Sequence, residues 1–497
     1  MARRRNPFPA LVAVALVPAL ILGGCWRFAS SRTPTAVSET VPESSVTVTV
    51  PDSSAAVPDQ PTTVPDTIAT PVISVRRAPA VLARDVNLAA FATEAEGFLP
   101  NIDDTSCVAI SVDGQSVASK NASVALRPAS NVKIITAAVA IEVLGPDFTY
   151  TTEVRGSLAG GVVDGDLFLV GGGDPVLSSS WWQGPNTKFP PFNVTSIEAF
   201  ADSIVAAGVT SITGGVVGDA SRYDDEWYAP SWAADVRFSE GGPVSALLAN
   251  DSRESNTLSS NDPAVGAATV LTAALIERGV TVGSSSSKGV APLDTPVVAS
   301  VQSQPLTAIV AEMLTTSDNN TAEMVLKEIG LQAGGAGTRE AGLNVVNTTL
   351  QQWGIPMDGV VLVDGSGLSD DNRLTCATML EMLQYLSPSD AVGLGLPVAA
   401  QAGGTLSDAF EGSPLAGVLR AKTGTLYNYD DGTGGKPGAK ALSGFVPIDG
   451  GGAIEFAMLL NGPQIAEKVV YRPVWDELAS LLAAYPSGPT VADLAPL

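Results

Sequence analysis

Hydrophobic and polar residues alternate at Cys107–Val112, and this two-residue period predicts a β-strand. Asp113-Gly114 follows directly, a pair typical of a tight type I′ hairpin turn. After a return strand, the spacing changes to that of an apolar helix, which begins near Ser130 and ends at Gly145-Pro146. The folded part of the chain is therefore expected to open with a hairpin followed by a helix.

The remaining elements divide into a long middle region and a C-terminal series. Residues from about 150 to 298 contain short strand patterns and one well-bounded helix, with Asp262 as N-cap, Pro263 in the first turn and Gly279 at the end. After it, helices are predicted at residues 305–314, 321–329, 338–353 and 375–386, strands at 419–426, 441–446 and 453–460, and a last helix to about 483. This order predicts an α/β (α+β) fold in which an antiparallel sheet, flanked by helices, is interrupted by a large β-rich insertion.

The N-terminus has the pattern of an export signal. The run Arg3-Arg4-Arg5 precedes an apolar segment over residues 8–22, and Gly23-Gly24-Cys25 follows. Residues 1–26 are predicted to be a signal peptide or a membrane anchor, and the residues before the cysteine also resemble a lipobox that would lipidate it. Cleaved lipoprotein, uncleaved anchor and simple secretion stay open, and each places the remainder outside the cytoplasm. Residues 27–86 are rich in Ser, Thr, Val and Pro, which predicts a disordered linker.

The chain has 497 residues and contains no histidine. This excludes a Ser-His-Asp triad and imidazole metal sites, so a nucleophilic serine would need another base, usually a lysine of lowered pKa. The formal net charge of −24 gives a surface that repels nucleic acid and anionic lipid headgroups. Neither is therefore expected as a partner, and no pattern implies a metal or an organic cofactor.

Three short motifs carry candidate chemistry: Ser130-Asn-Val-Lys133 at a helix start, Ser317-Asp318-Asn319 between two helices, and Lys422-Thr423-Gly424 on a strand. Each also has a structural interpretation, as a helix cap, an interhelix turn and a strand end. Copies of two of the patterns occur at Ser285-Ser-Ser-Lys288 and Ser259-Ser-Asn261, in turn-like sequence and in the wrong order. The first set has the order and the local structure that catalysis needs, so we favour the functional interpretation.

The motifs supply the groups that acyl transfer through a serine requires. Ser130 would attack a carbonyl, and a neutral Lys133, one helical turn away, would accept its proton. The pKa of Lys133 must be lowered for this role, and Lys422 is the second cation that would lower it while attracting a substrate carboxylate. Ser317 would relay a proton between Lys133 and the leaving amine. Glu323 is expected to be a structural carboxylate at a helix start rather than a water-activating base.

Substrate-binding groups are expected next to the catalytic ones. The Asn319 amide can hold a substrate peptide group, and the Thr423 hydroxyl can bind the carboxylate that Lys422 attracts. Gly424 leaves room for a substrate along the strand, and the backbone N–H groups of Ser130 and Thr425 would hold the oxyanion. The predicted substrate-binding residues are therefore Asn319, Lys422, Thr423, Gly424 and Thr425.

The three motifs together resemble those of class C (type 4) low-molecular-mass penicillin-binding proteins, which are D-alanyl-D-alanine carboxypeptidases and endopeptidases. The similarity runs from about residue 88 to about residue 485. It includes the stretches at residues 165–175, 303–306, 317–323, 364–369, 404–406, 422–426 and 441–445. It implies a transpeptidase-like catalytic domain split into residues 87–152 and 299–490, with two smaller inserted domains, II and III, at residues 153–298.

The resemblance implies an exported serine DD-peptidase that cleaves D-alanyl-D-alanine bonds of peptidoglycan stem peptides through an acyl-enzyme on Ser130 and is inhibited by β-lactams such as penicillin. It would act in the cell envelope, tethered to the outer face of the cytoplasmic membrane through its N-terminus, or be secreted. Two alternatives stay open: a β-lactamase or esterase on the same fold, and a penicillin-binding sensor or cell-wall-binding protein without turnover. Carboxypeptidase or endopeptidase preference, stem-peptide specificity and oligomeric state stay open as well.

Two further features lie outside the motifs. Residues 427–440 form a Gly-rich extension that the family usually lacks. We interpret it as a surface insertion, and the alternative is that Tyr427 or Tyr429 shapes access for a cross-linked peptide. Cys107 and Cys376 could pair in an oxidising compartment, but we expect two separately buried thiols, because a single possible pair in a long chain is weak evidence.

Overall fold

The computed structural model describes residues 79–184, 188–428, 437–448 and 451–494 of the chain. The chain divides into two units, Met1–Ala69 and Thr70–Leu497, and all described residues belong to the second. Within them, no helix is both long enough and apolar enough to span a bilayer. The predicted signal peptide or anchor, Cys25 and the linker up to residue 78 lie outside the described residues.

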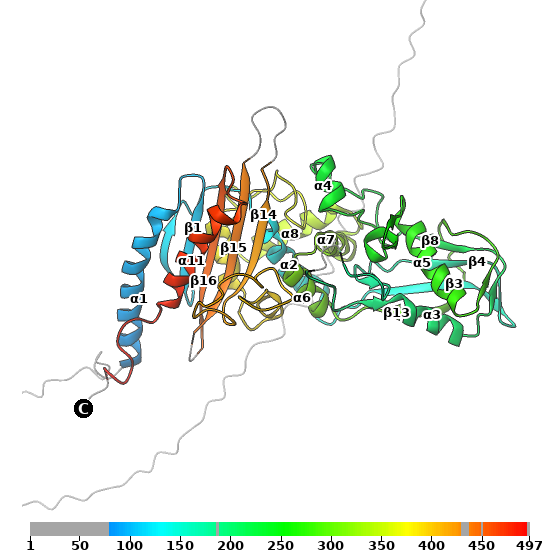
Figure 1. Cartoon of the computed structure of the whole chain (residues 1–497), viewed down its shortest axis with the longest axis horizontal. Coiled ribbons are helices and arrows are strands. Elements are labelled where there is room, and N and C mark those ends of the chain that lie inside the picture. Colours follow the sequence, from blue (N-terminus) through cyan, green and yellow to red (C-terminus); the bar gives the residue numbers. More distant parts are fainter. Residues whose placement is uncertain (1–78, 185–187, 429–436, 449–450, 495–497) are drawn as a thin grey trace, which may run out of the picture. The chain divides into compact units, whose positions relative to one another are not determined.

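The centre of the described unit is a five-stranded antiparallel sheet with the strand order β14-β15-β16-β1-β2. Its strands are β1 (Cys107–Val112), β2 (Gln115–Lys120), β14 (Arg420–Leu426), β15 (Gly438–Pro447) and β16 (Ala453–Gly462). The turn after β1 is of the predicted kind, since Asp113 and Gly114 have φ angles of 49° and 75°. Strands from both ends of the sequence meet in one sheet, which confirms the predicted fold class (Figure 1).

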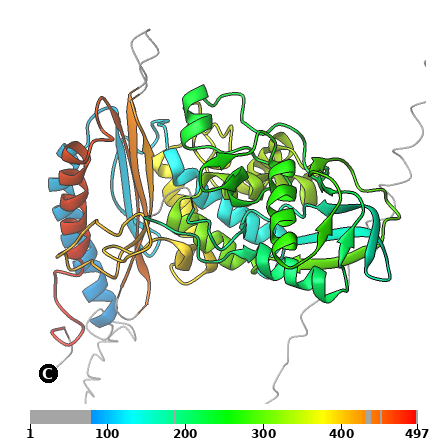
Figure 2. The same ribbon diagram turned by 45° about the vertical axis from the view of Figure 1, so that its right-hand side comes forward.

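Helices cover both faces of this sheet. Helices α1 (Pro79–Phe98) and α11 (Lys468–Ala483) lie side by side on one face, where Figure 2 shows them in blue and red. Phe91 of α1 and Trp475 of α11 belong to one buried apolar cluster on this side. The other face carries α2 (Val132–Leu144) and the helices around it.

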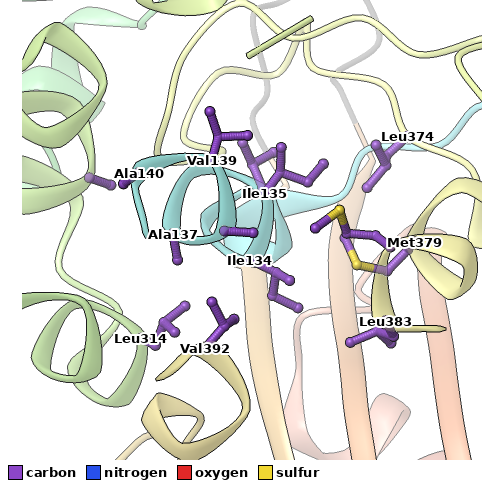
Figure 3. Close-up of a cluster of buried hydrophobic side chains, with 14 of the residues drawn as sticks. Ile134, Ile135, Ala137, Val139, Ala140, Leu314, Leu374, Met379, Leu383 and Val392 are labelled. Atoms are coloured by element: carbon purple, nitrogen blue, oxygen red, sulfur yellow. The ribbon is translucent and has the colours of Figure 1, made fainter. Parts of the chain in front are cut away.

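Helix α2 is the buried centre of the second face. Every residue from Val132 to Ala140 is buried, as expected for a helix that is apolar all round. Figure 3 shows its side chains among those of the neighbouring elements, with Leu314 and Met379 at its sides. Lys133 lies within this apolar segment, so its amine has to find hydrogen-bond acceptors inside the protein.

The helices after the insertion lie close to their predicted positions. They are α6 (Leu306–Thr316), α7 (Asn319–Gly334), α8 (Arg339–Gln352), α9 (Cys376–Tyr385) and the short α10 (Ala391–Gly395). Asp318, Thr338 and Thr375 cap α7, α8 and α9, each side chain accepting a hydrogen bond from a backbone N–H in the first turn. The predicted starts at residues 338 and 375 coincide with two of these caps, whereas α7 begins before its predicted start at residue 321.

Helix α1 begins at Pro79, whereas composition placed the residues up to 86 in the linker. Ala83, Asn87, Phe91 and Ala95 recur every four residues and are buried, so one face of the helix packs on the sheet from its first turns. The Asn87 side chain also donates a hydrogen bond to the Ala83 carbonyl. The first buried residues of this face are small or polar, so the sequence shows no apolar stripe there and the start of the helix was not predicted.

The insertion contains a seven-stranded sheet in which β11-β7-β4-β3-β13 are consecutive and β8 pairs with β4 and β12. Its strands are β3 (Thr151–Ala159), β4 (Val162–Val170), β7 (Ser211–Ile212), β8 (Val216–Asp219), β11 (Thr281–Val282), β12 (Ser287–Lys288) and β13 (Val297–Gln302). Helices α3 (Ile197–Ala206), α4 (Ala234–Ser239) and α5 (Pro263–Glu277) accompany them. Asp262 caps α5 as predicted. The division of the insertion into domains II and III stays a prediction.

Cys107 in β1 and Cys376 at the start of α9 form a disulfide bond, so the prediction of two separate thiols is wrong. The two residues are 269 positions apart in the sequence, but α9 packs against β1 and both cysteines lie in the same buried cluster. The possible pair could be named from the sequence, but its formation depends on the folded sheet, which brings the two segments together.

Candidate active site

Ser130 lies in a single 3-10 turn, η4 (Ala129–Asn131), that leads directly into α2. Ala129 has a φ of 48°, in the left-handed region that few residues with a side chain adopt. The turn presents Ser130, half-buried, at the N-terminal end of α2. Lys133 follows in the first turn of that helix, and its Nζ lies 3.1 Å from Ser130 Oγ. The hydroxyl and the amine that the sequence paired are therefore neighbours.

The amine of Lys133 is enclosed by three oxygen atoms. Besides Ser130 Oγ, they are Asn319 Oδ1 at 2.7 Å and the carbonyl oxygen of Ser366 at 2.7 Å. The side chain is fully buried, and no carboxylate among the described residues forms an ion pair with it. The amine therefore has its hydrogen bonds satisfied without a counter-ion, and its burial makes the ammonium form less stable than it is in water.

Burial lowers the pKa of Lys133 to about 8. The carboxylates of Asp318 and Asp364 act in the opposite direction and limit the shift. We expected Lys422 to be the cause of a lowered pKa at Lys133, but the cause that dominates is burial in the apolar segment of α2.

Lys422 lies on β14 and is also fully buried. Its Nζ donates hydrogen bonds to Ser317 Oγ at 2.7 Å and to the Thr423 carbonyl at 2.9 Å. Burial, and then the ammonium groups of Lys133 and Lys440, lower the pKa of Lys422 well below its usual value. Ser317 is thus in contact with Lys422, whereas the sequence analysis expected it to serve Lys133.

Asn319 is the first residue of α7, and both ends of its amide are engaged. Oδ1 accepts from Lys133, and Nδ2 donates to the carbonyl of Glu240 at 2.8 Å, just after α4 of the insertion. The neighbouring Asn320 accepts from Gly242 N–H at 2.7 Å. The insertion therefore reaches the site at the start of α7, and a substrate that used Asn319 Nδ2 would take the place of the Glu240 carbonyl.

The Lys422-Thr423-Gly424 segment lies against the turn that carries Ser130. A side-chain carbon on Gly424 would come within 2.9 Å of the Pro128 carbonyl oxygen, so glycine allows this close approach. Asn131 Nδ2 donates to the Lys422 carbonyl at 3.1 Å and holds the two segments together. The sequence analysis explained the glycine by room for a substrate, and its contact with the Ser130 turn is a second reason.

The hydroxyls of the same strand are also engaged. Thr423 Oγ1 lies 2.9 Å from the hydroxyl of Thr405. Thr425 Oγ1 accepts a hydrogen bond of 2.7 Å from Lys440 Nζ on β15. Strand β14 is at the edge of the sheet, and its start is bridged there, since the Ala421 N–H donates to the Pro397 carbonyl at 3.1 Å. From Lys422 onward no further strand of the described residues pairs with this edge, so an extended peptide could pair with it.

Glu323 on α7 holds the loop that supplies the Ser366 carbonyl. Its Oε1 accepts from the N–H groups of Gly365 and Ser366 at 2.9 and 2.8 Å, and its Oε2 accepts from Arg339 Nε at 3.0 Å. With both oxygens occupied and the side chain fully buried, Glu323 is a structural carboxylate, in line with the interpretation of the sequence.

The sequence analysis missed two contributors to the site. The Ser366 carbonyl is a backbone acceptor, and no side-chain type marks such a group in a sequence. Asp364 fixes the same loop by accepting from the N–H groups of Gly367 and Ser369 at 2.8 and 2.6 Å. The family resemblance included residues 364–369, so it marked this loop as relevant. It did not indicate that the loop supplies a hydrogen-bond acceptor to Lys133.

The Gly-rich extension is only partly within the described residues. Tyr427 is largely exposed at the end of β14. Tyr429 lies outside the described residues, so the alternative that it shapes substrate access stays a prediction. In the described part of the chain, no cluster of His, Cys, Asp or Glu side chains could hold a metal ion.

Comparison with known proteins gives relatives of one kind. The chain is 29% identical to a D-alanyl-D-alanine carboxypeptidase from an Actinomadura species over 456 residues, covering 75% of this chain and 79% of the relative. It is 32% identical over 370 residues to carboxypeptidase DacB of Mycolicibacterium smegmatis, covering 70% and 74%.

A solved structure supports the fold independently. The crystal structure of penicillin binding protein 4 (dacB) from Haemophilus influenzae superposes with a TM-score of 0.64 at 20% identity, covering 78% of this chain and 99% of that one. The family model of the D-Ala-D-Ala carboxypeptidase 3 (S13) family matches residues 99–260 and 249–485. The chain therefore belongs to this family of serine D-Ala-D-Ala carboxypeptidases, and the resemblance and enzyme class predicted from its motifs are confirmed.

Proposed function

We propose that Ser130 is the nucleophile of this carboxypeptidase, that Lys133 is its base, and that the substrate is the D-alanyl-D-alanine end of a peptidoglycan stem peptide. One observation carries the proposal. A buried lysine amine of lowered pKa lies 3.1 Å from a serine hydroxyl and has no carboxylate partner among the described residues. A chain without histidine needs such a base to activate a serine.

Acylation follows from this arrangement. Ser130 Oγ bonds to the carbonyl carbon of the penultimate D-alanine, and its proton passes to Lys133 Nζ. The oxyanion accepts hydrogen bonds from the backbone N–H groups of Ser130 and Thr425. When the peptide bond breaks, the leaving amine takes a proton from Ser317, which takes one in turn from the Lys422 ammonium beside it.

Deacylation restores each group. Water attacks the ester carbon, and its proton returns to the pair formed by Ser317 and Lys422. Lys133 gives its proton back to Ser130 Oγ as the ester bond breaks. The peptide leaves one residue shorter, or separated from its cross-linked partner if the leaving amine belonged to a second stem peptide.

Substrate recognition is proposed for the remaining motif residues. Lys422, Thr423 and Thr425 bind the free carboxylate of the terminal D-alanine, Gly424 lets the peptide lie along β14, and Asn319 Nδ2 holds a peptide carbonyl. Penicillin carries a carboxylate and a reactive carbonyl, so it occupies the same groups and acylates Ser130. No nucleic acid is involved, because the net charge of −24 opposes it.

The place of action is proposed to be the cell envelope. Residues 1–26 direct export, as a signal peptide, lipoprotein signal or anchor at the outer face of the cytoplasmic membrane, and residues 27–78 form the linker. The disulfide between Cys107 and Cys376 supports an oxidising compartment. The catalytic domain comprises residues 87–152 and 299–490, preceded by the first turns of α1, and residues 153–298 form domains II and III.

Labelling of the full chain with a fluorescent penicillin tests the proposal. We expect an adduct on the Ser130 peptide that is absent in Ser130→Ala and unchanged in Ser285→Ala, which alters the copy of the motif at Ser285-Ser-Ser-Lys288. The wild-type chain should also release D-alanine from a peptide that ends in D-Ala-D-Ala. Rapid turnover of nitrocefin without D-alanine release would identify a β-lactamase instead, and a stable adduct with no turnover would identify a sensor.

A further inference from the structure

Lys440 is a basic residue next to the candidate site that the mechanism does not use. It lies on β15 directly opposite Thr425 of β14 in the register of the sheet. Its Nζ donates a hydrogen bond of 2.7 Å to Thr425 Oγ1. Residues opposite each other on neighbouring strands place their side chains on the same side of the sheet, so this contact follows from the pairing itself.

Asp408 is the carboxylate whose charge acts on Lys440, and it does so from beyond ion-pair distance. Its Nζ lies 4.3 Å from the ring centre of Tyr471 and 5.1 Å from that of Trp475, both on α11. In the described part of the chain, no carboxylate forms an ion pair with it. Burial lowers its pKa to about 8, so most of it remains an ammonium at neutral pH. In a chain with 51 acidic and 27 basic side chains, a half-buried cation with no carboxylate in direct contact calls for an explanation.

The hydrogen bond fixes the direction of the Thr425 hydroxyl. An ammonium group has only donors, so Thr425 Oγ1 must accept from Lys440 and its own hydrogen must point elsewhere. Thr425 is two residues after Thr423 on one strand, and the two side chains therefore lie on the same side of β14. Thr423 is the hydroxyl proposed to bind the substrate carboxylate, and Thr425 remains half-exposed beside it.

We propose that Lys440 is a positioning residue for substrate recognition: it holds the Thr425 hydroxyl as a donor toward the free carboxylate of the terminal D-alanine. The positive charge behind that hydroxyl strengthens the bond to an anion. Lys440 thereby increases the preference of the site for peptides that end in a carboxylate. This inference rests on the proposed function, because it assumes that a D-alanine carboxylate lies at Thr423 and Thr425.

The test compares two peptides, one ending in D-Ala-D-Ala with a free carboxylate and the other with the same end as a carboxamide. In Lys440→Met, which keeps the length of the side chain, we expect KM for the carboxylate peptide to rise about tenfold while kcat changes little. Turnover of the carboxamide should change little, so the ratio of kcat/KM for the two peptides should fall about tenfold. Thr425→Val should lower this ratio by the same factor, and the double variant should lower it no further than either single variant.

Arg472→Met is the matched control. The Arg472 guanidinium also lies over Tyr471 and Trp475, at 5.6 and 5.9 Å, but it makes no hydrogen bond to Thr425. If Lys440 only anchors α11 to the sheet through these rings, both variants should lower the melting temperature and neither should change the carboxylate preference. That result, or additive effects of Lys440→Met and Thr425→Val, would overturn the inference.

The wild-type chain separates this inference from the proposed function. If it neither labels on Ser130 nor releases D-alanine, the proposed function fails and the comparison has no basis. If it does both and prefers the carboxylate peptide, but Lys440→Met and Thr425→Val keep that preference, only the inference about Lys440 fails.

Discussion

The Nζ atom of Lys133 lies 2.7 Å from the carbonyl oxygen of Ser366, and this contact determines what a neutral amine can do. A neutral lysine amine has two hydrogens and one lone pair. The Ser366 carbonyl and Asn319 Oδ1 can only accept, so they take the two hydrogens. The lone pair is then left for the third neighbour, the hydroxyl of Ser130 at 3.1 Å. The two acceptors thus direct the base toward the nucleophile.

The rate of acylation should rise with pH. The pKa of Lys133 is lowered to about 8 and only the neutral amine can accept the Ser130 proton, so the rate constant for penicillin acylation should increase through about pH 8 and then level off. Stopped-flow acylation between about pH 6 and pH 10 measures this. Lys133→Arg should lose the rise together with most of the rate, while Arg472→Met should keep both. A rate that is flat in pH would contradict a base of this pKa.

Glu323→Gln should slow acylation by disturbing the Ser366 carbonyl. Glutamine has one acceptor oxygen, so it cannot serve both the N–H groups of Gly365 and Ser366 and the guanidinium of Arg339. A displacement of the loop by about 1 Å should reduce the acylation rate roughly 100-fold. Rapid-mixing measurements of penicillin acylation, with thermal unfolding alongside, measure both effects.

Glu328→Gln is the control for that variant. Glu328 is another fully buried carboxylate of α7, and it pairs with Arg222 and Tyr223 instead of the loop at Ser366. Each variant breaks a buried ion pair and should lose about 3 kcal/mol of unfolding free energy. Only Glu323→Gln should slow acylation, and equal rates in the two variants would refute a role for the loop.

Gly367→Ala should disturb the turn that carries Ser130. Gly367 has a φ of 80°, and a side-chain carbon there would lie 1.9 Å from the Ala129 carbonyl oxygen. Gly354 has a similar φ of 74° but nothing within 4 Å of that position, so Gly354→Ala carries the same backbone strain without the clash. We expect acylation to fall roughly 100-fold in Gly367→Ala and to stay near wild type in Gly354→Ala. If acylation slows equally in both variants, backbone strain rather than the clash with Ala129 explains the loss.

Asp174→Asn should stabilise the protein above neutral pH. Burial raises the pKa of Asp174 from 3.8 to about 6, and its Oδ2 has no hydrogen-bond partner among the described residues. The folded state therefore binds this proton more tightly than the unfolded chain, and the stability it contributes is lost as pH rises through about 6. Removing the charge should raise the unfolding free energy by up to about 3 kcal/mol at pH 8, with the gain disappearing below about pH 4.

Urea unfolding at several pH values measures this gain, and Asp219→Asn is the comparison. Asp219 is also buried in the insertion, but its two oxygens accept from the N–H groups of Ser221 and Ala291. In Asp219→Asn the side-chain NH2 group would face one of these N–H groups, so two donors would meet. This variant should therefore lose stability at every pH. A loss of stability in Asp174→Asn at pH 8 would mean that its charge is compensated.

Local signals account for what the sequence predicted well. The Asp113-Gly114 turn and the Asp262 cap depend on a few adjacent residues, and both lie where they were expected. The family could also be predicted from the sequence, because the spacing and order of the three motifs can be read directly from the chain. Ser130 and Lys133 are neighbours because they are three positions apart, about one helical turn.

Contacts made by the tertiary structure could not be predicted in this way. The Ser366 carbonyl is a backbone group, Lys440 faces Thr425 through strand pairing, and Cys376 reaches Cys107 through the packing of α9 on the sheet. The pKa of Lys133 likewise depends on how deeply α2 is buried, which the sequence indicated only as a run of apolar residues. Each of these depends on segments far apart in the chain.

The disulfide between β1 and α9 changes what a proteolytic cut can do to this protein. Cys107 and Cys376 lie on either side of the whole insertion, which includes exposed stretches such as the one around Leu293, 95% exposed. A cut there would leave two fragments still joined by the S–S bond, and the five-stranded sheet, with its strands all outside the cut region, would remain one covalent body. A protease that cleaves the insertion would therefore cut the chain without separating the two parts of the five-stranded sheet.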